Sequence, residues 1–127
     1  MESKFKFTNP RIQDLKFCIN KNWGKTPAIE IQNSMSLQKE KNDSENSALV
    51  ELRLEIGECE GNVPFFVDIT IVSVFKWDDD ITDPNKYLDI NAPALLLSYA
   101  RPIIASITAY SGLPAYHIPF INFNEIE

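Results

Sequence analysis

Apolar and polar side chains alternate through the first part of the chain, and this period of two predicts β-strands. In residues 12–20, polar or smaller side chains alternate with Leu15, Phe17 and Ile19. Residues 28–38 repeat the alternation, so we expect a second strand there, after a connection that glycine and proline punctuate. Asn33 interrupts the apolar face of this second segment, which indicates a bend or a bulge.

The two runs that follow alternate more regularly and carry larger apolar side chains. Residues 48–59 place leucine and isoleucine on one face, and glutamate and arginine on the other. Residues 65–77 place on one face Phe65, Val67, Ile69, Ile71 and Phe75. The opposite face of this last segment includes Phe66 and Asp68 and is only half polar, which indicates contact with a partner.

Short polar connections join these segments, and such connections favour antiparallel neighbours. The longest of them, KEKNDSENS at residues 39–47, is charged and rich in turn-forming residues. We therefore predict an α+β domain in which residues 12–77 form a four-stranded antiparallel meander, after an N-terminal segment at 1–11. One long helix packs on this sheet at 93–111, and an extended crossover with the C-terminus occupies 112–127.

The predicted helix follows an acidic loop, DDDITDPNKYLD. Asn91 is the expected N-cap and Pro93 lies in the first turn, whereas Gly112 is the expected C-terminal stop. Pro102 lies inside the helix, where it removes a backbone hydrogen bond. We expect a kink there, or a helix that restarts.

This helix is apolar around most of its circumference, and Arg101 is its only charged residue. A four-stranded sheet covers one side of a helix, so the remaining apolar surface requires another layer. A second copy of the chain is the economical layer. The alternative is that the C-terminal tail folds over the helix. The residues expected to contact the second copy are Leu95, Tyr99, Ile103 and Ile107.

Composition narrows the classes of function. The 127 residues fit a single domain, and the net charge of −6 with a pI of about 4.8 disfavours binding to nucleic acids or to anionic membranes. The N-terminus, MESKFKFTNP, lacks the apolar run of a signal peptide, and we expect no stretch long enough to span a membrane. Cys18 and Cys59 form no CxxC motif, so we expect reduced thiols and a cytoplasmic location.

Few residues are available for enzymatic chemistry. A nucleophile needs a base and an orienting group nearby, and the only histidine, His117, lies in the apolar crossover. A Cys-His hydrolase is an alternative that lacks any local signature. The cysteines and His117 show no metal-ligand spacing, and the acidic run at 78–80 lacks the pattern of a calcium loop. We therefore expect a protein that is not an enzyme and needs neither cofactor nor metal.

The stretch from residue 95 to 123, LLLSYARPIIASITAYSGLPAYHIPFINF, resembles the SecB family of protein-export chaperones. The family pattern is an apolar run, a Tyr-Ala-Arg, an apolar helix, a glycine, and an extended apolar crossover that closes on Pro-x-(Ile/Val)-Asn-Phe. The matching residues here are Tyr99-Ala100-Arg101, Gly112 and Pro119-Phe120-Ile121-Asn122-Phe123. Ile12, Asp14 and Phe17 also fit the first strand of the family.

The resemblance implies a four-stranded antiparallel sheet with the long helix packed on it, and a dimer of dimers, hence a homotetramer, with these helices at the interface. It implies an ATP-independent holdase that binds non-native preproteins and passes them to the motor SecA in protein export. The family positions that face SecA fall on Asp14 and Asp68, with an apolar neighbour at Phe66. The alternative is that both carboxylates are ordinary solvated sheet residues.

The sequence also departs from the family pattern. Cys18 stands at a third acidic position, Ser98 at a usual proline, and Pro102 at a usual acidic residue. The family continues into a second long helix that flanks the client groove, and we expect this helix to be missing here. We expect its absence to change the shape of the groove and the affinity for clients.

We expect clients to bind in a groove between the crossover and the inner edge of the sheet, because non-native chains expose apolar side chains. The residues expected to line this groove are Leu113, Tyr116, Ile118, Phe120 and Phe123 of the crossover, with Met35, Phe65, Val67 and Ile69 of the sheet. Each of them could instead belong to the core. Two other functions stay open: a SecB-like chaperone dedicated to one partner such as an antitoxin, and an oligomeric structural subunit that binds no clients.

Overall fold

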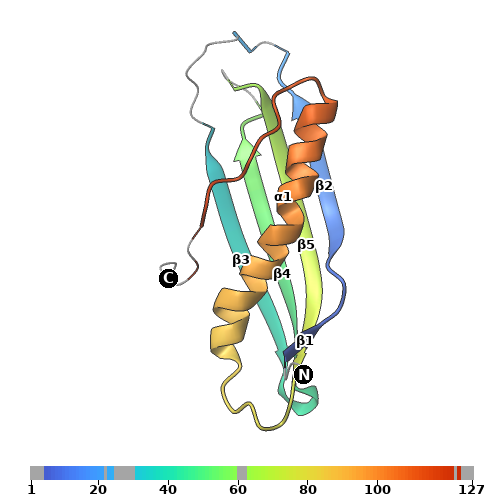
Figure 1. The fold of residues 1–127 in the computed structure, drawn as a ribbon, viewed down its shortest axis with the longest axis vertical. Helices are drawn as coiled ribbons and strands as arrows, with labels where there is room; N and C mark the ends of the chain where they lie inside the picture. Colours follow the sequence, from blue (N-terminus) through green and yellow to red (C-terminus); the bar gives the residue numbers. More distant parts are fainter. Residues whose placement is uncertain (1–4, 22, 25–30, 60–62, 122, 124–127) are drawn as a thin grey trace.

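A computed structural model describes residues 5–21, 23–24, 31–59, 63–121 and 123, and places helical segments on one face of an antiparallel sheet (Figure 1). The strands are β1 (Phe5–Phe7), β2 (Arg11–Ile19), β3 (Asn33–Asn42), β4 (Ser47–Gly57) and β5 (Phe65–Trp77). A 3₁₀ turn, η1 (Asp43–Glu45), joins β3 to β4, and a π-helical turn, η2 (Tyr87–Asn91), precedes the helix α1 (Ala92–Tyr110). The predicted α+β class is confirmed.

The sheet has five strands in the order β1-β5-β4-β3, and β2 also pairs with β5. β1 pairs with residues 75–77 of β5 and β2 with residues 65–72, so β1 and β2 share one edge of the sheet. Two details of the prediction are therefore wrong. Residues 5–7 belong to the sheet, and the meander holds only for β3, β4 and β5, because β2 pairs with β5 instead of β3.

The break between β1 and β2 follows from the chemistry around Pro10, which has no N–H to donate to a ladder. Thr8 ends the first piece: its amide donates to the carbonyl of Val74 (2.9 Å), and its Oγ1 accepts from the amide of Val74 (3.0 Å). The connection at 20–32 is long enough for the chain to pass from this edge to the opposite one. Alternation within a strand carries no information about such a crossing.

Helical backbone begins before the predicted start, because η2 leads directly into α1. Asn91 has helical dihedral angles and makes no side-chain capping bond, so the predicted N-cap is wrong. The predicted stop is confirmed: Gly112 has a φ of +84°. The amide of Leu113 donates to the carbonyl of Thr108 and the amide of Gly112 donates to that of Ala109, both at 3.1 Å. These two bonds form a Schellman motif.

Pro102 lies inside α1, and the helix continues through it instead of restarting. Proline removes the amide that would donate to the carbonyl of Ser98. Pro102 and Ser98 both lie on the exposed side of the helix, where water can satisfy that carbonyl. The proline is therefore tolerated at a place where the helix loses no buried hydrogen bond.

The core lies between α1 and the inner face of β4 and β5. Along α1, fully buried residues recur at helical spacing as Leu96, Ala100, Ile104 and Thr108. The sheet contributes to the core Leu52, Ile56, Val67, Ile69 and Ile71. Because the buried stripe passes through Ala100, the side of α1 that bears Tyr99 points away from the sheet.

The helical run Tyr87–Tyr110 is long and apolar enough to cross a membrane, by length and composition alone. The expectation that no stretch of the chain reaches this length is therefore wrong. A core helix that buries one stripe against a sheet has the same composition, and α1 buries such a stripe. We assign the run to the core of the domain.

Candidate functional site

The segment after α1 crosses the helix-covered side of the sheet in an extended conformation (Figure 1), and we call its described residues, 113–121 and 123, the crossover. Figure 1 shows it running from the end of α1 toward β3. Among its described residues it pairs with no strand, and its prolines at 114 and 119 have no N–H to donate. Side chains of α1 and β3 hold it instead.

Thr108 joins the start of the crossover to the buried side of α1. Its hydroxyl donates to the carbonyl of Ile104 (2.8 Å) and accepts from the amide of Tyr116 (2.9 Å). A hydroxyl can do both at once, whereas an apolar side chain of the same shape would leave the Tyr116 amide without this partner. This explains a polar residue in the otherwise apolar buried stripe.

Arg101 holds the middle of the crossover. Its Nη1 donates to the carbonyl of Ile118, and its Nη2 donates to the carbonyl of Pro119 (3.1 Å). Hydrogen bonds from an ionised donor are stronger than neutral ones. The side chain of Ile118, beside these carbonyls, is only 4% exposed. The Tyr-Ala-Arg motif therefore uses its arginine to fix the backbone of the crossover over the core.

Tyr116 connects the crossover to two strands. Its hydroxyl accepts from Nδ2 of Asn33 (2.9 Å) and donates to Oδ1 of the same residue (3.1 Å). Its ring packs edge-on against the ring of Phe65, with 5.5 Å between the ring centroids. The ring centroids of Phe65 and Phe17 are 6.1 Å apart. This aromatic row links the crossover to β5 and β2.

Five of the predicted client-binding residues lie in the core. Val67 and Ile69 are 0% exposed, and Phe65 is 3% exposed. Ile118 and Phe123 of the crossover are also buried. These five side chains do not line an open groove, contrary to the prediction, because α1 and the crossover itself occupy the inner face of the sheet.

The other four predicted client-binding residues are accessible along the crossover. Met35, Leu113 and Tyr116 are half-buried, and Phe120 is 85% exposed. We call these four residues the apolar strip. A phenylalanine this exposed suits contact with another apolar chain.

The outer face of the sheet carries the three positions predicted to face SecA. Asp14 is exposed and Phe66 is half-buried. Asp68 accepts two hydrogen bonds from Arg53 of β4, at 3.0 Å from Nε and 2.8 Å from Nη2. These bonds, with further attraction from Arg53 and Lys16, hold the pKa of Asp68 below its usual range. The carboxylate of Asp68 is thus already paired within the sheet, whereas Asp14 is open to solvent.

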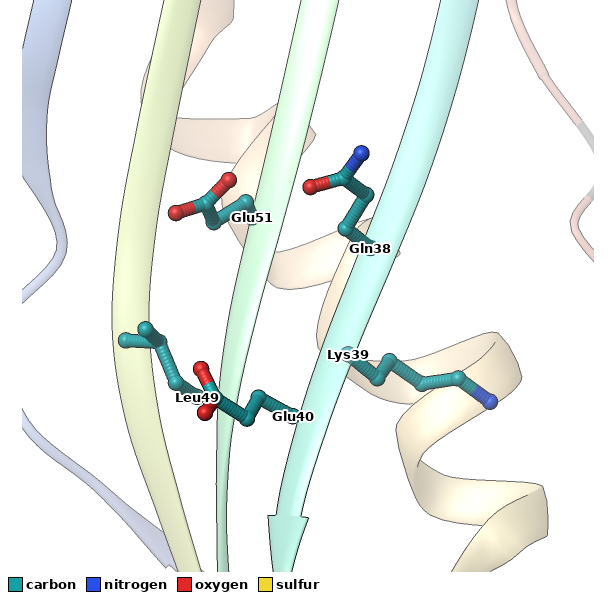
Figure 2. A pocket seen from close by; sticks show the side chains of 5 residues that line it. All are labelled: Gln38, Lys39, Glu40, Leu49 and Glu51. Atoms are coloured by element: carbon teal, nitrogen blue, oxygen red, sulfur yellow. The ribbon is translucent and has the colours of Figure 1, made fainter.

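A shallow hollow of about 380 Å³ lies on the same outer face between β3 and β4 (Figure 2). The residues that line it are Gln38, Lys39, Glu40, Leu49 and Glu51. Lys39 points away toward the helical side, where it pairs with Asp89 of η2. Within the described part of the chain, no three His, Cys, Asp or Glu side chains gather closely enough to hold a metal. We assign no binding role to this hollow.

The outward side of α1 is apolar and accessible. Tyr99 is 40% exposed, and Leu95, Ile103 and Ile107 are half-buried. The crossover docks on the side of the helix that bears Arg101 and Thr108, and it leaves these four residues open to solvent in part. The apolar side of α1 that was predicted to contact a second copy is therefore still accessible in the single chain.

Of the three residues suggested for a Cys-His hydrolase, Cys18, Cys59 and His117, the first and the last lie on opposite sides of the sheet. Cys18 pairs with Phe66 in the register of β2 and β5 and so lies on the outer face. His117 is exposed on the crossover, which covers the inner face. This arrangement does not bring His117 to the Cys18 thiol.

Comparison with known proteins places this fold. The sequence model described as preprotein translocase subunit SecB matches residues 6–126, nearly the whole chain. Together with the helix-covered sheet and its apolar crossover, this match defines the class of the protein as a molecular chaperone. The chain belongs to the SecB family.

Solved structures from two bacteria share the fold. The SecB-like chaperone Rv1957 of Mycobacterium tuberculosis, in complex with a ChAD peptide from the HigA1 antitoxin, has a TM-score of 0.69, with 12% identity, covering 93% of this chain and 91% of its own. A protein of unknown function from Streptococcus agalactiae has a TM-score of 0.52, with 12% identity, covering 91% and 97%. An uncharacterized protein of Methanocaldococcus jannaschii is 24% identical over 121 residues, which is 92% of this chain and 78% of that protein.

The sequence analysis did not predict the role of three residues that hold the crossover. Arg101 and Thr108 lie seven positions apart in an apolar helix, where a polar side chain needs a specific partner. Asn33 interrupts the apolar face of its strand because it binds Tyr116, not because the strand bends there. In each case the signal was a polar residue on an apolar face.

Proposed function

We propose that this protein is an ATP-independent holdase that binds non-native polypeptides through the apolar strip along the crossover. The observation that carries the proposal is Phe120, which is 85% exposed on the extended crossover; Leu113 and Tyr116 of the same segment and Met35 of β3 are half-buried. Membership of the SecB family supports it. The proposal includes a cytoplasmic location and no enzymatic activity, cofactor or metal.

Binding of a permanently unfolded polypeptide tests this proposal. A reduced and carboxymethylated protein is titrated into the chain by calorimetry. Phe120→Ala should weaken binding about tenfold, because burial of a phenylalanine side chain contributes about 1.5–3 kcal/mol. Ile12→Ala is the matched control, since Ile12 is an exposed apolar residue of β2 away from the strip. The absence of binding at high micromolar concentration would refute the holdase function.

The proposal also includes a homo-oligomer, a dimer or a tetramer, that assembles through the outward side of α1. The apolar Tyr99, Ile103 and Ile107 support it, because a second copy could cover the same surface with its own. Light scattering with chromatography gives the molar mass, and Ile103→Lys should shift the protein toward the monomer. A wild-type protein that is monomeric at micromolar concentration contradicts this assembly.

A chaperone dedicated to one partner is the second candidate. Rv1957, which shares the fold, was solved with a peptide from an antitoxin, and this favours a narrow client range. Affinities for several unrelated unfolded polypeptides separate the two functions. Values that agree within about tenfold support a general holdase for preproteins, whereas one partner bound at least about 100-fold more tightly supports a dedicated chaperone.

Transfer of clients to SecA in protein export and translocation stays a prediction. Asp14 and Phe66 are accessible for such a contact, whereas Asp68 is paired with Arg53. If SecA binds this face, Asp14→Lys should weaken its binding more than Asp68→Asn does. A titration of the two variants with purified SecA measures this order.

A further inference from the structure

The crossover behaves as an extended peptide bound to the rest of the domain. Ile118 and Phe123 are 4% and 9% exposed and belong to the same core cluster as Val67 and Ile69. The crossover thus fills an apolar seat beside α1 with side chains that are themselves apolar. An extended client has the same features, namely apolar side chains and unpaired backbone groups.

Apart from the side-chain bonds between Tyr116 and Asn33, the polar contacts that hold the described crossover are made to its backbone. Arg101 donates to the carbonyls of Ile118 and Pro119, and Thr108 accepts from the amide of Tyr116. Every polypeptide has carbonyls and amides, so these contacts do not depend on the sequence of the bound segment. By contrast, each of β3 and β4 is held by a continuous antiparallel ladder.

The crossover can also move without disrupting α1. The Schellman motif completes the helix at Gly112, whose φ of +84° reverses the chain direction. The backbone bond from Leu113 to Thr108 belongs to this motif. Beyond Leu113, the described crossover makes no backbone–backbone hydrogen bond to the remaining described residues. Once its side-chain contacts are broken, rotation just after Leu113 would move the crossover away from the core.

We propose that Arg101 is a positioning residue that latches the crossover over the core, and that a client displaces the crossover from this seat. Displacement by a client rests on the proposed holdase function. The latch does not, because it is a property of the free protein. Its guanidinium is the one charged group of α1, and it donates to two successive carbonyls, which a lysine ammonium cannot match with a planar fork.

Thiol labelling of the free protein tests the latch. In a Cys18→Ser, Cys59→Ser background, Ile118→Cys provides a single thiol at a position that is 4% exposed. Adding Arg101→Ala should speed its reaction with a thiol reagent about tenfold, since each charged hydrogen bond that is lost favours the open state. Arg101→Lys should give an intermediate rate. Equal rates with arginine and alanine, at temperatures where both proteins are folded, would overturn the latch.

Arg11→Ala is the matched control for loss of a positive charge. Arg11 is exposed on β2 and lies in the register opposite Val72, away from the crossover. It should leave the labelling rate of Cys at position 118 unchanged. A rate increase equal to that of Arg101→Ala would show that net charge acts instead of the latch, and would overturn the proposal.

The same labelling experiment with a bound polypeptide tests whether a client displaces the crossover. A saturating unfolded polypeptide should raise the labelling rate in the protein that retains Arg101, and Arg101→Ala should bind this polypeptide about tenfold more tightly. Weaker binding by Arg101→Ala, or binding that leaves the labelling rate unchanged, would overturn displacement. If no polypeptide binds, the holdase function fails, while the labelling rates in the free protein still decide whether the latch exists.

Discussion

The two faces of one sheet are built on different principles. On the inner face, β4 and β5 bury aliphatic side chains such as Ile69 against α1, and the polar groups there are few and specifically paired, as Thr108 is with Tyr116. On the outer face, Arg53 and Asp68 form an ion pair in contact with solvent. The inner face therefore contributes most of the folding free energy, whereas the outer face can exchange its polar partners at little cost.

This contrast also shows where a binding function can arise. The crossover belongs to the inner face through Ile118 and to the surface through Phe120. Two residues of one short segment thus serve packing and exposure. Binding surface of this kind is made at the margin of a core, where a segment is attached by a few side-chain contacts instead of a ladder.

The largest difference between the two faces should appear when a core residue is truncated. Ile69→Ala removes a fully buried side chain of the inner face and should lower the free energy of unfolding by about 2–5 kcal/mol. The side chain of its neighbour Thr70 lies on the outer face, so Thr70→Ala should lower the free energy of unfolding far less. Urea unfolding of the two variants measures the difference, and similar costs would show that the faces do not differ as described.

Gly57 and Gly112, the glycines with positive φ among the described residues, should respond differently to alanine. At Gly57, an added Cβ would lie 2.1 Å from the carbonyl oxygen of Phe65, and φ is +79°. At Gly112, φ is +84° but nothing lies within 4 Å of the added Cβ. Gly112→Ala should therefore cost only about 1–2 kcal/mol of backbone strain, and Gly57→Ala clearly more. Thermal unfolding checks this order, which a larger effect at Gly112 would contradict.

Removal of the buried hydroxyl should have a moderate effect. Thr108→Val keeps the shape of the side chain but leaves the amide of Tyr116 without its partner, which should cost about 1–3 kcal/mol. Hydrogen exchange at Tyr116 should quicken as well. Ser106→Ala, on the exposed side of the same helix, is the control and should change neither quantity by much. Unchanged exchange in Thr108→Val would show that the hydroxyl does not hold the crossover.

The smallest effect is expected at the outer ion pair. The pKa of Asp68 is lower in the folded protein than in the unfolded chain, so the pair stabilises the fold above a pH of about 4 and is lost as the pH falls further. Asp68→Asn should lower the melting temperature by a few degrees at pH 7, and the difference from wild type should shrink below pH 4. Calorimetry at several pH values measures this, and a constant difference would contradict it.

The sequence was sufficient for the positions of β4, β5 and the end of α1, and insufficient for strand partners. It was also wrong about residues 39–42, which were predicted as loop but extend β3 to Asn42. Alternation located β4 and β5, and Gly112 located the end of α1, because these signals are local. The pairing of β2 with β5 was missed because several strand orders satisfy the same alternation. The burial of Val67 and Ile69 beneath other elements also depends on how the chain returns over the sheet, which no local pattern records.

The broken edge strand has a consequence for a protein whose clients are sticky, extended chains. An uninterrupted edge would offer a long row of free amides and carbonyls on which foreign strands could assemble into aggregates. Here Pro10 divides that row, and the register shift between Ile12 and Asp14 bends what remains. A strand added at this edge can pair with at most the nine residues of β2 in one piece, so the interruption shortens the template for aggregation that this edge offers.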